Sequence, residues 1–297
     1  MKLISLILSI VLSISIIALI FNITLKQNIF DESYHKNIVK KEGLNKEIKD
    51  RVEEKLKLVT VESNCPETLY QNIVVDDMID INVDKIVEEN IKAINKQDYN
   101  KDVVNVDDLL NAYNQRIDDY IQSRNVEMDD DAIIVINYVK LRAKEEVLAA
   151  ISSINFWTFL ENHENSTILN LFLSTSAFTN IRFVMVSLLI ILLTIIGIFI
   201  LNSNKLTLFF KYIGIALFIG GAVPFSVGLG GNLSNISKSI LFMGTAANKL
   251  LTALIDSAFS FLTVSGLIVL AIGILAVIVS ALTVPRRVRS SLSRTTM

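Results

Sequence analysis

Residues 181–201 read IRFVMVSLLIILLTIIGIFIL, and their only ionisable side chain is that of Arg182, at the start. A helix needs roughly 20 apolar residues to cross the ~30 Å hydrocarbon core of a bilayer. Three further stretches are similarly apolar: Leu3–Phe21, Leu206–Gly230 and Phe259–Val284. The sequence therefore predicts an integral membrane protein with four spans.

Charge is sorted sharply along the chain. The block from Lys26 to Ile181 holds 29 of the 30 acidic residues and 18 of the 28 basic residues, a net charge of −11. So acidic a block repels nucleic acid and anionic lipid headgroups, and nucleic acid is excluded as a partner. One cysteine, Cys65, allows no intramolecular disulfide and leaves a free thiol or an intermolecular bridge.

The first apolar run begins after Lys2. Its length, and the absence of a small-residue cleavage site after Phe21, favour an uncleaved signal anchor over a cleaved signal peptide.

Orientation follows from the basic residues in the short flanks of the spans. Lys205 lies in the tight turn between spans two and three, and the acid-free tail carries Arg286, Arg287 and Arg289. We therefore expect a multi-pass protein of the cell (cytoplasmic) membrane, with cytoplasmic N- and C-termini and an extracytoplasmic large domain.

Apolar residues in the acidic block recur every three to four positions, with a break at Gly43 and no sustained alternation. We place a helix start at Asp84. The predicted fold class is all-α, with a four-helix transmembrane bundle and a mainly helical extracytoplasmic domain between spans one and two. The predicted segments are span 1 (1–25), the acidic domain (26–180), span 2 (181–201), span 3 (206–230), an outer interfacial helical loop (231–258), span 4 (259–284) and a basic tail (285–297).

The only tryptophan, Trp157, lies in an apolar and aromatic segment shortly before span two. Because an indole ring favours the headgroup region, we predict that Trp157 is an interface anchor. The same segment could instead form a groove for a partner.

No sequence motif identifies a catalytic, cofactor or metal site. Asp80, Asn82 and Asp84 resemble the opening of a calcium loop, but Lys85 and Ile91 stand where that loop needs glycine and glutamate. The two histidines lack ligand spacing, and no nucleophile elbow is present. We therefore expect no catalytic residue, no cofactor and no metal site.

Small residues concentrate in spans three and four. We predict that they form the helix-packing contact between these spans, with Pro224 kinking span three. The alternative is a broken third helix that lines a substrate path. The predicted helix-packing residues are Gly214, Ala216, Gly220, Gly221, Pro224, Gly266 and Gly273.

The layout of an anchor, a Phe30-x3-Tyr34-x3-Ile38 helix, an acidic helical domain and three further spans resembles a loose group of bacterial four-span membrane proteins. That group offers no activity to transfer. The order of loops also resembles that of claudins, but the claudin signature of tryptophan, glycine and paired cysteines is absent, so no residue role is carried over.

We expect a non-enzymatic membrane protein whose outer domain binds, senses or scaffolds a partner. The expected partners are the lipid bilayer and an extracytoplasmic or membrane protein, with a homo-oligomer as a further form. The alternative is a transport or pore component built around the Gly- and Pro-containing third span. An ion-coupled transporter is disfavoured, because the spans hold almost no ionisable residue. A membrane-embedded enzyme ranks third.

Overall fold

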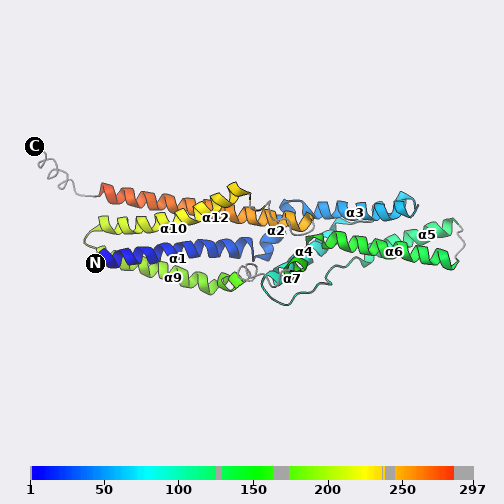
Figure 1. Cartoon of the computed structure of the whole chain (residues 1–297), viewed down its shortest axis with the longest axis horizontal. Coiled ribbons are helices and arrows are strands. Elements are labelled where there is room, and N and C mark those ends of the chain that lie inside the picture. The colour runs from blue at the N-terminus through cyan, green and yellow to red at the C-terminus, as the bar shows by residue number, and fades with distance from the viewer. Residues whose placement is uncertain (1, 125–128, 163–173, 236, 238–244, 284–297) are drawn as a thin grey trace, which may run out of the picture. The chain divides into compact units, whose positions relative to one another are not determined.

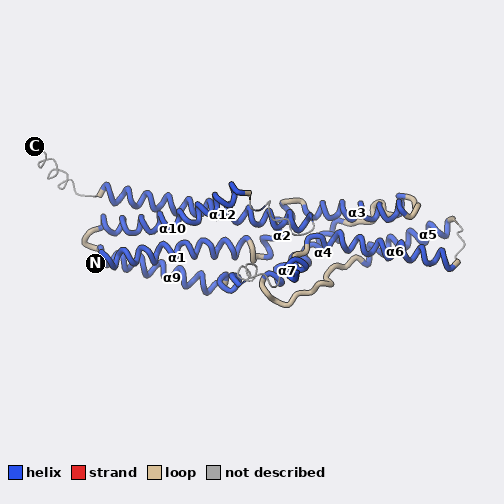
Figure 2. The backbone as a smooth tube through the Cα atoms, in the orientation of Figure 1, coloured by secondary structure: helices blue, strands red, loops and turns tan. Residues whose placement is uncertain are grey.

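A computed structural model of the 297-residue chain describes residues 2–124, 129–162, 174–235, 237 and 245–283. Within these ranges the chain consists of helices joined by turns and loops, and it contains no strand (Figures 1 and 2). The predicted all-α class is confirmed.

Four helices have the length and apolar composition to cross a membrane. They are α1 (Lys2–Asn28), α9 (Ile181–Asn202), α10 (Leu206–Ser234) and α12 (Thr245–Leu282). The shortest, α9, has 22 residues, which at 1.5 Å per residue span about 33 Å. The chain is thus consistent with a multi-pass membrane protein.

The described residues belong to two compact units. Unit 1 takes its residues from Met1–Phe30, Ser174–Ser239 and Ile255–Met297, and unit 2 from Asp31–Leu173 and Ile240–Leu254. Helix α12 contributes its first turns to unit 2 and the remainder to unit 1.

In unit 1, α1 packs against both α9 and α10. Its apolar core is formed by Leu12, Ile16, Ile20, Ile198, Ala216 and Leu262. Asn180 begins α9 by accepting a hydrogen bond from the backbone N–H of Arg182 (3.1 Å). Only Ser203, Asn204 and Lys205 separate α9 from α10, so these two helices form a tight hairpin.

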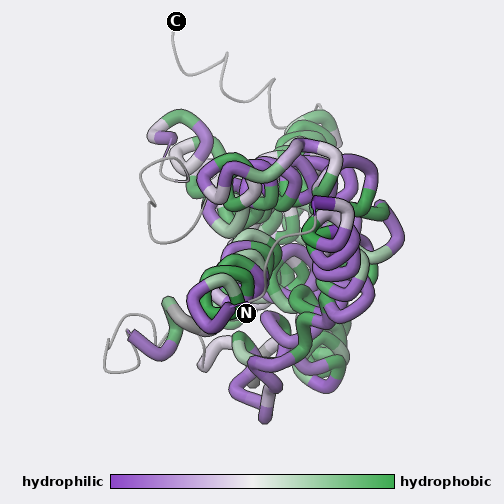
Figure 3. Tube along the Cα trace, turned by 90° about the vertical axis from the view of Figure 1, so that its right-hand side faces the viewer, coloured by the Kyte–Doolittle hydropathy of each residue, from purple (hydrophilic) through white to green (hydrophobic). Residues whose placement is uncertain are grey.

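Unit 2 is a set of amphipathic helices. Hydrophilic and hydrophobic residues are interleaved within single helices of the chain (Figure 3). The helices of this unit are α2 (Glu32–Lys41), α3 (Leu44–Glu62), α4 (Asp76–Ile94), α5 (Asp107–Ser123), α6 (Asp130–Ile151) and α7 (Trp157–Asn162), with short 3₁₀ turns at Glu67–Leu69 and Ser152–Ile154.

Local chemistry sets the helix ends in unit 2. Asp31 caps α2 through the N–H of Tyr34, and Asp129 caps α6 through the N–H of Ala132, each at 2.8 Å. Gly43 separates α2 from α3 at a φ of +64°, a left-handed conformation that glycine adopts without steric cost. The predicted break at Gly43 is therefore confirmed.

The core of unit 2 forms mainly where α3 packs on α4 and α6. Leu44, Ile48, Val52, Leu56 and Val59 bury one face of α3 at the helical spacing. An ion pair between Lys55 and Glu146 (2.7 Å) and another between Arg142 and Glu62 (2.5 Å) join α3 to α6 beside this apolar contact.

One expected helix start was wrong. Asp84 lies inside α4, which begins at Asp76 after the extended residue Val75. The later part of the predicted outer interfacial helical loop (231–258) is helical, and α12 runs through position 258 into the predicted span 4. No glycine or proline interrupts the chain from Thr245 to Ser265, so the helix has no reason to stop.

Buried polar contacts fix the connection between α6 and α7. The side chain of Asn90 donates to the carbonyl of Ile154 (3.0 Å) and accepts from the N–H of Phe156 (2.7 Å), and Asn90 is fully buried. An Asn90→Ala substitution leaves both backbone groups buried without these partners.

We expect Asn90→Ala to lower the free energy of unfolding by about 2 to 3 kcal/mol. Thermal unfolding of the full chain in detergent, followed by circular dichroism, measures the change. Asn37→Ala, at an exposed position of α2, is the matched control and should leave the transition unchanged. Equal effects of the two substitutions would contradict the role given to Asn90.

Candidate functional site

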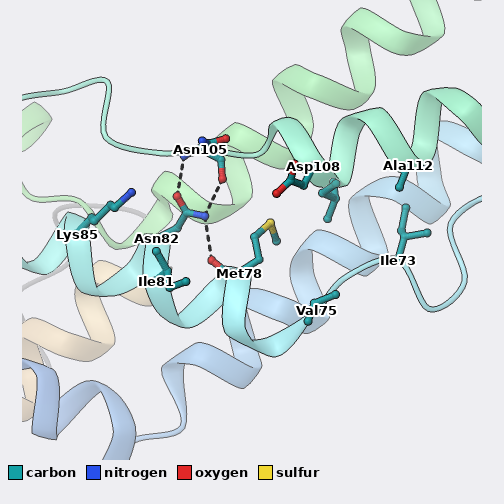
Figure 4. Close-up of a pocket in the computed structure, with 10 residues that line it drawn as sticks. Ile73, Val75, Met78, Ile81, Asn82, Lys85, Asn105, Asp108 and Ala112 are labelled. Carbon is teal, nitrogen blue, oxygen red and sulfur yellow. Dashed lines mark hydrogen bonds between the residues drawn. The ribbon is translucent and has the colours of Figure 1, made fainter.

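A groove in unit 2 lies where the first turns of α4 and α5 come together, and its volume is about 520 Å³ (Figure 4). Pockets of this size are typical of ligand sites in proteins. The residues that line it are Ile73, Val75, Met78, Ile81, Asn82, Lys85, Asn105, Asp108, Leu109 and Ala112.

Most of the lining is apolar, and part of it is open to solvent. Val75 is 58% exposed and Ile81 is 56% exposed, while Ile73 and Leu109 are buried. Met78 also lines the groove (Figure 4), and its flexible thioether side chain adapts to irregular partners. Apolar side chains held open to water in an otherwise charged unit are typical of a binding surface.

Asn82 holds the two walls of the groove together. Its amide nitrogen donates to the carbonyls of Met78 (2.9 Å) and Asn105 (2.8 Å), and its amide oxygen accepts from the N–H of Asn105 (2.7 Å). Asn82 is only 2% exposed, so these bonds are shielded from water. The groove is therefore preformed by a buried polar contact.

The connection from α4 to α5 continues from this contact. Asn105 accepts a hydrogen bond from the N–H of Asp107 (3.0 Å) at the start of α5. Nearer α4, the buried carboxylate of Glu89 accepts from the N–H of Asn100 (2.6 Å). Val103, Val104 and Val106 thus belong to the connecting loop that these hydrogen bonds hold in place before α5.

The acidic series that resembled a calcium loop is helical instead. Asp80, Asn82 and Asp84 all lie within α4, and Asn82 is occupied by the loop contact. In the described part of the chain, no group of three His, Cys, Asp or Glu side chains is arranged to hold a metal ion.

Trp157, predicted as an interface anchor, packs inside unit 2. Its side chain is 5% exposed, and its ring stacks on Tyr99 with centroids 6.3 Å apart. Tyr99 bonds to Glu161, and burial together with that carboxylate raises the pKa of Tyr99 to about 12. The aromatic pair ties α7 to the loop after α4.

A second apolar surface lies on the outer side of α6. Ile134, Tyr138 and Leu141 follow one face of this helix, and each is more than half exposed. This face belongs to one helix, whereas the groove is lined by residues of two helices and of the segments that precede them.

In unit 1, glycines bring the backbones of α10 and α12 together. Gly214, Gly221 and Gly228 recur every seven residues, as do Gly266 and Gly273. A Cβ atom added at Gly221 would lie 2.6 Å from the carbonyl oxygen of Gly266, and one added at Gly228 would lie 2.5 Å from the nitrogen of Thr263. Only glycine permits so close an approach.

The pairing runs antiparallel. Gly214 lies against Val277 and Gly228 against Thr263, while Gly273 lies against Phe218. A seven-residue repeat keeps one face of each helix on its partner along the whole contact, as in left-handed helix pairs.

Ala216 and Gly220 face a different helix. Ser13 of α1 donates to the carbonyl of Ala216 (3.1 Å), and a Cβ atom added at Gly220 would lie 3.0 Å from Ile16. These two residues, expected to contact span four, therefore belong to the contact with α1.

The sequence interpretation missed the serines of α1. Ser5, Ser9 and Ser13 recur every four residues and are buried. The Ser9 hydroxyl donates to the backbone carbonyl of Tyr212 in α10 (3.2 Å), and the side-chain amide of Asn202 in α9 donates to the Ser5 hydroxyl (2.9 Å). The signal was available, because small residues four apart in an apolar helix mark a packing face.

The remaining predicted residues are placed as follows. Pro224 is buried in α10, which continues as a helix on both sides of it. Lys205 is exposed and precedes α10. Arg286, Arg287 and Arg289 lie outside the described residues.

No family model, no curated protein and no solved structure matches this chain.

We expect Gly221→Ala to destabilise the helical bundle of unit 1 by about 1 to 3 kcal/mol, because the new methyl group meets backbone atoms of α12. Unfolding of the full chain in mixed detergent micelles measures the change. The matched control is Gly230→Ala, where a Cβ atom meets nothing within 4 Å. The control should be neutral or slightly stabilising, and a loss equal to that of Gly221→Ala would contradict the packing account.

Proposed function

We propose that this chain is a non-enzymatic protein of the cytoplasmic membrane whose helical unit 2 faces the extracytoplasmic side and binds a protein partner in the groove between α4 and α5. The groove is the observation that carries the proposal. It combines solvent-exposed apolar side chains with walls fixed by a buried asparagine.

The arrangement of the chain supports this orientation. With four spans, the segments between spans one and two and between spans three and four emerge on the same side of the bilayer. Both segments contribute to unit 2, and Lys249 near the start of α12 pairs with Glu47 of α3 (3.1 Å). The short α9–α10 turn with the exposed Lys205 then lies on the cytoplasmic side.

The spans are better suited to anchoring than to transport. The glycine-bearing faces of α10 are filled by α12 and α1. Helix α10 also continues through Pro224 without the unwound segment that binds substrates in many transporters. The small residues of the third span therefore serve helix packing in this proposal.

A photo-reactive amino acid placed at Ile81 of the full-length protein tests partner binding in native membranes. We expect a crosslinked protein adduct at Ile81, because this exposed side chain lines the groove. The control is the same amino acid at Glu54, an exposed position of α3 outside the groove. Mass spectrometry identifies the captured protein.

Crosslinking at a third position, Tyr138, distinguishes binding at the groove from binding at the apolar face of α6. An adduct at Tyr138 on α6 without one at Ile81 would assign binding to α6 and overturn the role of the groove. The same adducts at Ile81 and Glu54 would indicate nonspecific capture, and the absence of adducts at all three positions would contradict partner binding by unit 2.

A further inference from the structure

The outer face of α6 differs in composition from that of the neighbouring helix α5. Every exposed side chain of α5 is polar, whereas the core side of α6 is buried in unit 2 and its outer side is apolar as well. A helix that is apolar on both sides is suited to contacts on both sides. The large apolar side chains that α6 exposes are Ile133, Ile134, Val135, Tyr138 and Leu141.

The spacing of these residues is that of a contact between two helices. Tyr138 follows Ile134 by four residues, and Leu141 follows Tyr138 by three. This alternation of four and three forms the apolar seam along which paired helices pack, and Val135 lies on one edge of it. The apolar face of α6 therefore fits a second helix that runs along it.

Polar and charged residues form the other edge of the seam. Asp130, Asn137 and Lys144 recur at intervals of seven residues, and all three are exposed. Residues seven apart lie on the same edge of a helix. The neighbouring cations Lys140 and Arg142 already pair with acids of α5 and α3. Lys144 forms no ion pair with another described residue, so it is available to a partner.

This edge is complementary to itself. Asp130 and Lys144 both lie seven residues from Asn137. When two copies of α6 lie antiparallel with the two-fold axis at Asn137, Asp130 of each copy therefore meets Lys144 of the other. In the same register, Ile134 enters the space between Tyr138 and Leu141 of the other copy. One arrangement thus satisfies both the apolar seam and its charged edge.

The acidic residues of the seam disfavour the parallel alternative. In a parallel pair each seam residue meets its own equivalent, so Asp131 would face Asp131 and Glu145 would face Glu145. Antiparallel packing separates the two acidic helix starts and places each of them beside Lys144. Glu145 then lies beyond Asp130, past the start of the opposite helix. Charge therefore selects the antiparallel pair.

We propose that the apolar face of α6 is a self-association surface, on which a second copy of this chain packs its own α6 antiparallel. Ile134, Tyr138 and Leu141 form the contact, and Asp130 pairs with Lys144 at each end. The contact would bury on the order of 1,000 Å², which is the size of weak and reversible interfaces. This surface is separate from the groove between α4 and α5, so the inference goes beyond the proposed function.

A charge exchange tests the pairing. Sedimentation of the full-length protein in detergent micelles, which impose no common orientation on the copies, measures self-association against protein concentration. We expect Lys144→Glu to weaken it by roughly three- to tenfold, because each glutamate then faces Asp130. Adding Asp130→Lys to Lys144→Glu restores opposite charges and should recover the association. Lys57→Glu, at an exposed position of α3, is the matched control and should have no effect.

Cysteine crosslinking with a short bis-maleimide tests the antiparallel register in a Cys65→Ser background. Asn137→Cys should crosslink to itself between two copies, because the two-fold axis passes beside this position. A mixture of copies that carry Asp130→Cys and copies that carry Lys144→Cys should give crosslinks between the two kinds. Crosslinks within each kind as strong as those between them would contradict the antiparallel pair.

The remaining outcomes separate this inference from the proposed function. A chain that stays monomeric, or whose association is unchanged by Tyr138→Ser or by Lys144→Glu, overturns the self-association surface. Capture of a different protein at Tyr138 in native membranes, without crosslinks between copies, also overturns it. Ile81→Ser should leave self-association unchanged. A monomeric chain that still gives a specific adduct at Ile81 would leave partner binding by the groove in place and remove only this inference.

Discussion

Hydrocarbon offers neither hydrogen-bond partners nor a hydrophobic gain when two apolar helices meet, and this constraint governs unit 1. Close contact between backbones must then provide the attraction. Gly214, Gly221 and Gly228 of α10 supply it against α12, while Ala216 and Gly220 receive α1. The serines of α1 add hydrogen bonds to carbonyls of α10 without adding bulk.

The same constraint explains the sorting of charge. Apart from Asp256 in α12, the acidic residues lie outside the four apolar helices and gather in unit 2, where they cap helices and pair with lysines on the surface. Unit 2 holds its shape with buried amides as well as apolar contacts. Asn82 and Asn90 each bind backbone atoms of a separate connection, so helix α4 fixes both the loop beside the groove and the connection between α6 and α7.

Periodicity and apolar length were sufficient to predict the all-α class and the four apolar helices, because both depend on local sequence. The packing of Trp157 could not be predicted in this way. Its amphipathic ring suits a membrane interface, but its burial depends on Tyr99, some 60 residues earlier, which no local pattern indicates. The groove was missed for the same reason. In the sequence, Asn82 appears only in a calcium-loop resemblance that fails at Lys85 and Ile91, and its partner Asn105 lies in a loop with no periodic signal.

The proposed function depends most directly on the side of the membrane that unit 2 faces. Labelling of intact cells with a membrane-impermeant maleimide tests this, using the native Cys65 of unit 2 and a Lys205→Cys substitution in a Cys65→Ser background. Burial raises the pKa of the Cys65 thiol, so its labelling should be slow at neutral pH and faster as the pH rises. We predict labelling of Cys65 in intact cells and labelling at position 205 only after the membrane is permeabilised. The reverse pattern would contradict the account.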